Sequence, residues 1–92
     1  MEFFAVAAGE RWEMGGEIPA PRTVTLRARI TGATGQHVAW MRNGKTIAET
    51  QVSVNADTML ETDAHAGDWF TIVVRDGGTP TVFANAIYVR RN

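Results

Sequence analysis

Two segments of the chain, residues 38–47 and 67–76, each combine an alternating strand pattern with a turn signal, and they restrict the fold more than any other feature. The first runs into Asn43-Gly44, the strongest short hairpin signal, because a type I′ turn needs positive φ at both central residues. The second, Trp69 to Arg75, carries β-branched and aromatic residues on both faces, as a central strand does. Both segments are typical of the middle of a β-sandwich.

The rest of the chain continues the same pattern. Residues 23–31 alternate cleanly, with Val24, Leu26, Ala28 and Ile30 on one side and polar residues on the other, which predicts a half-buried strand. Further strands are expected at 1–8, 38–42, 45–54, 58–62, 69–75 and 81–90. Residues 12–21 hold two glycines and two prolines and are expected to form an irregular connection outside any central strand.

These seven strands at about 8 to 12 residue spacing, without a helical period, predict an all-β fold. We expect one immunoglobulin-like antiparallel β-sandwich over residues 1–92. The expected core consists of Val24, Leu26, Ile30, Val38, Trp40, Ile47, Phe70, Ile72, Val74, Ile87 and Val89.

Composition excludes several classes of function. A formal net charge of −1 argues against a nucleic-acid partner, which usually meets a basic surface. No apolar run reaches the ~18 to 20 residues that span a bilayer, so no membrane partner is expected. The absence of cysteine rules out disulfides, thiolate metal sites and a cysteine nucleophile, and leaves the compartment open.

No catalytic, cofactor or metal site is expected. The nearest approach to a metal motif is Asp63-x-His65-x-x-Asp68, and its favoured interpretation is a water-facing turn, as for the isolated His37. Ser53, the single serine, lacks a nucleophile-elbow glycine frame. The chain alone is therefore not expected to be an enzyme.

Two charged groups invite a functional interpretation, and both are better explained as solvated surface. The glutamates of residues 10–17 have no neighbours that would separate their protonation behaviour. Arg27 and Arg29 line one strand face, which Arg75 and Arg90 are expected to approach, and such a stripe could hold an anion. A charged face that discourages edge pairing is favoured.

The three tryptophans offer the remaining candidates for a site. Trp40 matches the buried core position of an immunoglobulin-like domain. Trp69 is opposite in phase to Phe70, so one of the two must face away from the core. Trp12 and Trp69 are thus candidates for a docking or ligand surface, unless the loop of Trp12 folds over the sheet end and buries both.

Four segments of the chain carry a family resemblance: 14–17 (Met-Gly-Gly-Glu), 38–48, 67–76 and 85–90 (Asn-Ala-Ile-Tyr-Val-Arg). They resemble the C-terminal β-sandwich of bacterial PHP-type metallohydrolases of the CehA/McbA group, over nearly the whole chain. One departure is Ala86, which stands where the family pattern usually has proline.

The resemblance implies a C-terminal fragment of a larger protein: a non-catalytic accessory domain that packs against or orients a metal-dependent, phosphoesterase-like PHP domain of the same parent chain. The metal ligands of that family belong to the PHP domain, and none of those motifs occurs in these residues. The main alternative is a carbohydrate-type binding module in which exposed Trp12 or Trp69 stacks on a sugar ring. A self-sufficient small enzyme is disfavoured.

Overall fold

The computed structural model describes residues 2–19, 21–30, 36–51, 57–76 and 79–90, and the described chain consists of strands and their connections. The strands are β1 (Glu2–Ala7), β2 (Glu10–Glu13), β3 (Glu17–Ile18), β4 (Arg22–Arg29), β5 (His37–Arg42), β6 (Lys45–Gln51), β7 (Asp57–Ala64), β8 (Trp69–Asp76), β9 (Thr79–Phe83) and β10 (Ile87–Val89). Within this described part, no helix is long and apolar enough to cross a membrane.

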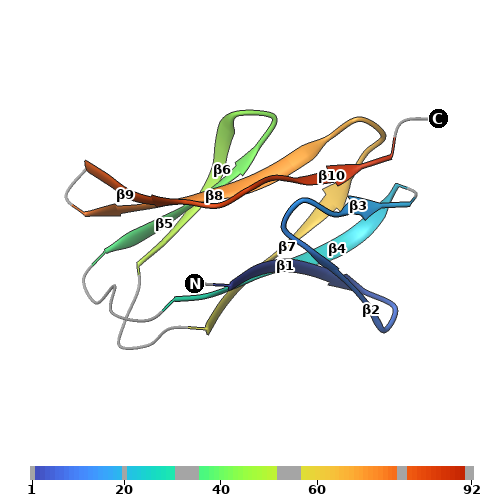
Figure 1. Cartoon of the computed structure of the whole chain (residues 1–92), viewed down its shortest axis with the longest axis horizontal. Helices are drawn as coiled ribbons and strands as arrows, with labels where there is room; N and C mark the ends of the chain where they lie inside the picture. Colours follow the sequence, from blue (N-terminus) through green and yellow to red (C-terminus); the bar gives the residue numbers. More distant parts are fainter. Residues whose placement is uncertain (1, 20, 31–35, 52–56, 77–78, 91–92) are drawn as a thin grey trace.

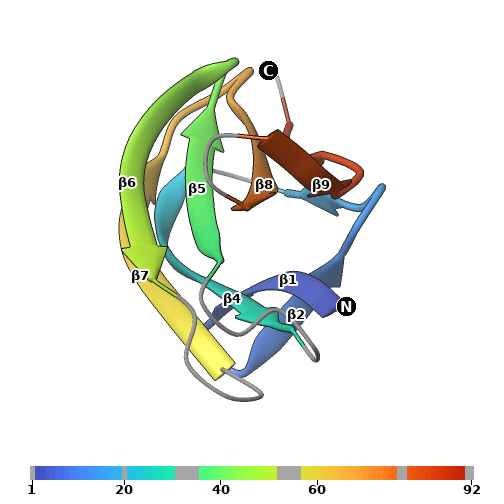
Figure 2. The same ribbon diagram turned by 90° about the vertical axis from the view of Figure 1, so that its left-hand side faces the viewer.

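The strands form two sheets that lie one above the other (Figure 1). Sheet A has the order β2-β1-β4-β7, and sheet B has the order β3-β10-β8-β5-β6, with β9 also paired to β8. Among the described strands, all pairings are antiparallel except that of β3 with β10. The turned view shows β6 and β7, the edge strands of the two sheets, along the same side of the sandwich (Figure 2). The all-β sandwich expected from the sequence is confirmed.

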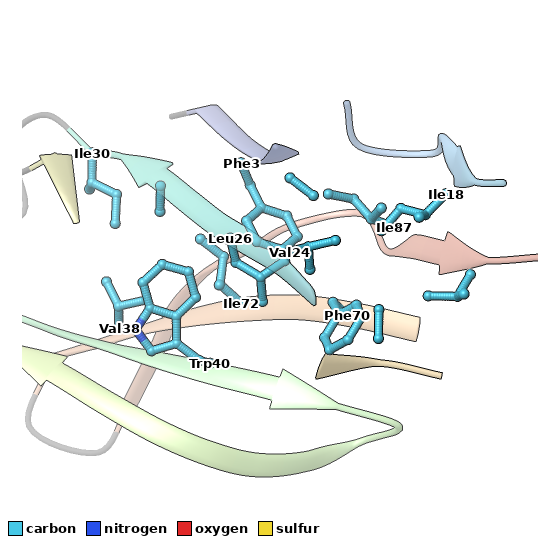
Figure 3. Close-up of a cluster of buried hydrophobic side chains, with 14 of the residues drawn as sticks. Phe3, Ile18, Val24, Leu26, Ile30, Val38, Trp40, Phe70, Ile72 and Ile87 are labelled. Carbon is cyan, nitrogen blue, oxygen red and sulfur yellow. The ribbon is translucent and has the colours of Figure 1, made fainter. Parts of the chain in front are cut away.

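The core fills the space between the two sheets (Figure 3). It is built from alternate residues of the facing strands, because successive side chains of a strand point to opposite faces. All of the expected core residues are buried except Ile47, which is partly buried. The core also contains residues that were not expected: Phe3, Ala5, Ile18, Ala28 and Ala64.

Trp40 is the largest fully buried side chain, and it lies in the core as expected. Its indole Nε1 donates a hydrogen bond of 3.0 Å to Thr50 Oγ1. A buried indole N–H needs such a partner, so β6 supplies both packing and polar satisfaction here. The Asn43-Gly44 hairpin between β5 and β6 is also confirmed, with φ of 54° and 81° at the two residues.

The expectation of an irregular connection over residues 12–21 was wrong in part. Ala8 and Gly9 both have positive φ and turn the chain back, so that β2 pairs with β1. After Gly15 and Gly16 the chain crosses to sheet B, where β3 pairs with β10. Both new strands lie at sheet edges, where the neighbouring prolines are tolerated.

The expected single strand over residues 81–90 is in fact two strands, β9 and β10, separated by residues 84–86. The number of strands is therefore ten rather than seven within the described part of the chain. The expected strand residues 52–54, with Ser53, lie outside the described residues.

The outer side of sheet A is covered by arginines. Phe4 points away from the core, and yet it is only 2% exposed. The guanidinium carbon of Arg11 lies 3.7 Å from the ring centroid, and those of Arg29 and Arg27 lie at 5.6 and 5.9 Å. Guanidinium groups bind the face of an aromatic ring and shield it from water. This second cover accounts for the burial of Phe4 on the outer side of β1.

Candidate functional site

The outer side of sheet B, by contrast, leaves large apolar side chains exposed. Phe83 is 68% exposed and Tyr88 is 50% exposed, on the neighbouring strands β9 and β10. Tyr88 is paired with Trp69 and Phe83 with Val73, both on β8. Trp69 and Val73 lie in the opposite phase to the core residues of β8, so all four side chains belong to the outer face. We call Trp69, Phe83 and Tyr88 the aromatic face.

The break between β9 and β10 explains why Phe83 belongs to the aromatic face. In one uninterrupted strand, Phe83 would share a side with Ile87, which is buried in the core. Instead, Ala84 packs against the core, and its amide donates to the Ile72 carbonyl at 3.1 Å. The irregular residues 84–86 shift the alternation by one position, which turns Phe83 outward.

Trp69 is held on the hairpin turn between β5 and β6. A Cβ placed on Gly44 would lie 3.7 Å from the indole Cη2 and Cζ2 atoms, so the ring rests against the Gly44 backbone. The Trp69 amide donates to Asn43 Oδ1 at 3.0 Å, and the Asn43 amide donates to the Trp69 carbonyl at 2.9 Å. Trp69 is consequently half-buried, with its position fixed by a turn from another part of the chain.

Asp68 adds further hydrogen bonds between the β5–β6 turn and residues 65–68, which connect β7 to β8. We call the contacts of Asn43 and Gly44 with Asp68 and Trp69 the turn lock. Asn43 Nδ2 donates to Asp68 Oδ1 at 2.9 Å, and the His65 amide donates to Asp68 Oδ2 at 3.0 Å. Partial burial alone would raise the pKa of Asp68. The hydrogen bonds from Asn43 and His65, with the attraction of the Arg42 and His65 charges, outweigh it and lower that pKa below its ordinary value.

The structure does not bring the two candidate tryptophans together. Trp12 is on β2, paired with Ala5, and it packs against the core at the edge of sheet A. The guanidinium carbon of Arg22 lies 5.3 Å from its ring centroid. Trp69 is on the outer face of the other sheet. Tyr88, which the sequence analysis missed, is the neighbour of Trp69 in place of Trp12, and Phe83 lies on the same outer face, opposite Val73.

The sequence did indicate the outward orientation of one of the two missed residues, Tyr88. With Ile87 and Val89 assigned to the core, strict alternation already turns Tyr88 outward. Phe83 had no such signal, because its orientation depends on the irregularity at residues 84–86.

The acidic and histidine candidates have local structural roles. Asp63 accepts a hydrogen bond from Thr23 at 2.9 Å, and Asp68 belongs to the turn lock. His65 joins it through its backbone, and His37 is exposed on β5. Among the residues that the structure describes, no three His, Cys, Asp or Glu side chains gather as a metal ion would require.

Arg75 and Arg90 do not join Arg27 and Arg29 in one stripe. Arg27 and Arg29 are on the outer face of sheet A and form ion pairs with Asp57 at 2.9 and 3.6 Å. Arg75 belongs to sheet B, because it is on β8. Arg90 follows β10 in sheet B and pairs with Glu17 at 2.8 Å. Arg27, Arg29 and Arg90 are thus each paired with a carboxylate from a neighbouring strand.

The same neutralisation applies to the glutamates of residues 10–17. Arg11 is hydrogen-bonded to Glu13 and lies 3.6 Å from Glu2. The hydrogen bond with Glu13 is the largest cause of the raised pKa of Arg11. Desolvation opposes it, and the attraction of the Glu13 and Glu2 charges adds to it. The exposed Glu13 and Glu17 therefore act as partners of arginines.

The four segments that carry the family resemblance lie against one another. The Gly15 amide donates to the Ala86 carbonyl at 2.8 Å, and the Tyr88 amide donates to the Gly16 carbonyl at 3.0 Å. The Val89 amide donates to the Asp68 carbonyl at 2.8 Å. With the turn lock between Asn43 and Asp68, these bonds connect all four segments at one end of sheet B. The segments thus form a structural unit beneath and beside Tyr88 and Trp69.

Comparisons with family models, with curated proteins and with solved structures gave no match for this chain.

Proposed function

We propose that this chain is a non-catalytic accessory domain that docks, through the aromatic face, on a PHP-type metal-dependent hydrolase domain of the same parent protein. The observation that carries the proposal is the exposure of Phe83 and Tyr88 on one side of sheet B. Single exposed apolar residues are ordinary, whereas several on one face of neighbouring strands are typical of an interface. The choice of partner rests on the resemblance of residues 14–17, 38–48, 67–76 and 85–90.

The geometry suits docking of a folded partner. Phe83 and Tyr88 face positions of β8 that are four residues apart, so their backbones are separated by about 13 Å along the sheet. A patch of this length offers two anchors to a broad, flat partner, and Trp69 lies beside one of them. Aromatic side chains are the residues that most often dominate the free energy of binding at interfaces.

The first experiment is to read the gene around this chain and to express any preceding PHP domain as a separate protein. We expect the two proteins to associate in titration calorimetry, and the Phe83→Ser/Tyr88→Ser variant to weaken the affinity at least tenfold, as loss of an interface anchor does. The matched control is Met59→Ser, because Met59 is 57% exposed on the outer face of the opposite sheet. The proposal is refuted if the gene encodes no PHP domain. It is also refuted if the Phe83→Ser/Tyr88→Ser and Met59→Ser variants bind the PHP domain with equal affinity.

One observation favours a second candidate, a carbohydrate-binding module. Trp69 and Tyr88 are direct partners on adjacent strands and share the outer face, so their Cβ atoms are about 5 Å apart. Two such rings form a platform of the kind on which sugar rings stack. Titration with soluble glycans should then change tryptophan fluorescence in the wild type and not in Tyr88→Ser. The absence of any change with the wild type would eliminate this candidate.

A further inference from the structure

Asn43-Gly44 combines a chemically reactive sequence with an unusually complete set of restraints. Glycine has no Cβ to hinder its backbone amide, so the asparagine side chain of an Asn-Gly pair is open to attack by the nitrogen of the next residue. Here both side-chain atoms of Asn43 are occupied: Oδ1 accepts from the Trp69 amide, and Nδ2 donates to Asp68. The indole of Trp69 lies against Gly44.

We infer that Asn43 is a site of spontaneous deamidation that the turn lock protects, and that the reaction, once it occurs, prevents the lock from closing again. The Gly44 nitrogen attacks Asn43 Cγ, a succinimide ring forms, and the side-chain nitrogen leaves as ammonia. Water then opens the ring at either carbonyl. The product is an aspartyl or an isoaspartyl residue at position 43, and no oxidant or reductant is needed.

Protection follows from the hydrogen bonds. Both bonds direct the side-chain amide of Asn43 toward the turn between β7 and β8. To bring Cγ onto the Gly44 nitrogen, the side chain must rotate and give up these partners. The reaction therefore proceeds from the fraction of molecules in which the two turns have separated, a local opening with its own free energy.

The consequence follows from charge. Asn43 Nδ2 lies 2.9 Å from an Asp68 oxygen, and the pKa of Asp68 is lowered, so this neighbour is a carboxylate at neutral pH. Deamidation replaces the donor with a second carboxylate, and two like charges at this distance repel each other. An isoaspartyl product also lengthens the backbone within the turn. Because Trp69 rests on this turn, the aromatic face changes with it.

The test is to incubate the folded chain and the urea-unfolded chain in the same mildly alkaline buffer, and to follow position 43 by peptide mapping and mass spectrometry. We expect fast conversion in urea and slow conversion in the folded chain. Asn85, which is exposed and followed by Ala86, is the internal control and should remain unmodified in both. Equal rates at Asn43 in the folded and unfolded chains, or no reaction in urea, would overturn the inference.

A variant tests the lock directly. Asp68→Ala removes the acceptor of the Asn43 amide, and deamidation of the folded variant should be about tenfold faster, the factor that corresponds to losing one hydrogen bond to a charged group. Circular dichroism establishes that the variant is folded, and an unchanged rate in the folded variant counts against the lock. If Asp68→Ala does not fold, the comparison of folded with urea-unfolded wild type decides alone.

Discussion

Replacing Phe4 by leucine tests whether the arginines on the outer side of sheet A stabilise the fold through the aromatic ring. Leucine keeps the site apolar but removes the ring face, 3.7 Å from the guanidinium carbon of Arg11. We expect a loss of about 1 kcal/mol for the cation–π contacts and about 1 kcal/mol for imperfect packing of the smaller side chain. The sum of about 2 kcal/mol corresponds to a fall in Tm of about 8 to 16 °C for a domain of this size.

The assay is urea denaturation of the wild type and of two matched variants. Phe83→Leu makes the same chemical change at a residue that is 68% exposed, and its effect should stay within about 0.5 kcal/mol. Combining Phe4→Leu with Arg11→Met isolates the contact itself, and the double-mutant cycle should give a coupling free energy of about 0.5 to 1 kcal/mol. A coupling free energy near zero, or equal losses for the two leucine variants, would show that the arginines do not stabilise the fold through the Phe4 ring.

Three further predictions concern the core, the crossing between the sheets and the turn lock. Trp40→Phe leaves a cavity and removes the donor to Thr50, so it should cost about 2 to 4 kcal/mol in denaturant unfolding, and less than additively with Thr50→Val. Gly16→Ala places a Cβ 2.8 Å from the Glu13 carbonyl oxygen, and its loss of about 1 to 3 kcal/mol should show as a lower denaturation midpoint. Asp68 has a lowered folded-state pKa, so its charge stabilises the fold above the ordinary value of 3.8, and this contribution is lost as pH falls through the folded-state pKa. The difference in unfolding free energy between wild type and Asp68→Asn, measured from neutral to acid pH, should therefore shrink as the pH falls below 3.8. A difference that stays constant over this pH series would contradict the prediction.

The sequence was sufficient to predict the features that depend on local pattern. The alternation around Val24 and Leu26, the type I′ signal at Asn43-Gly44 and the buried Trp40 each follow from residues close together in the chain. The two-sheet fold followed from the number and spacing of such patterns.

The features that were missed depend on partners distant in sequence. β3 has only two residues, and it is a strand because β10 lies beside it. Residues 3–8 are apolar on both faces, which indicates cover from two sides, but they cannot show that arginines from β2 and β4 cover Phe4. Phe83 faces outward because irregular residues shift the alternation, and Asn43 meets Asp68 across 25 positions of the chain. Local propensity carries no information about these long-range contacts.

The parallel pairing of β3 with β10 determines when the sandwich can close during synthesis. The paired residues 17–18 and 88–89 are 71 positions apart in the chain, so β3 gains its partner only after the intervening residues have been synthesised. Until β10 is present, β3 has no neighbour in sheet B. The edge of β8 that pairs with β10 is then also unpaired, at Trp69 and Phe70. Contacts of such high sequence separation form slowly, because the intervening chain must be ordered first. Before β10 pairs, this edge of β8 is exposed, which makes it the natural place for a chaperone to act or for misassembly to begin.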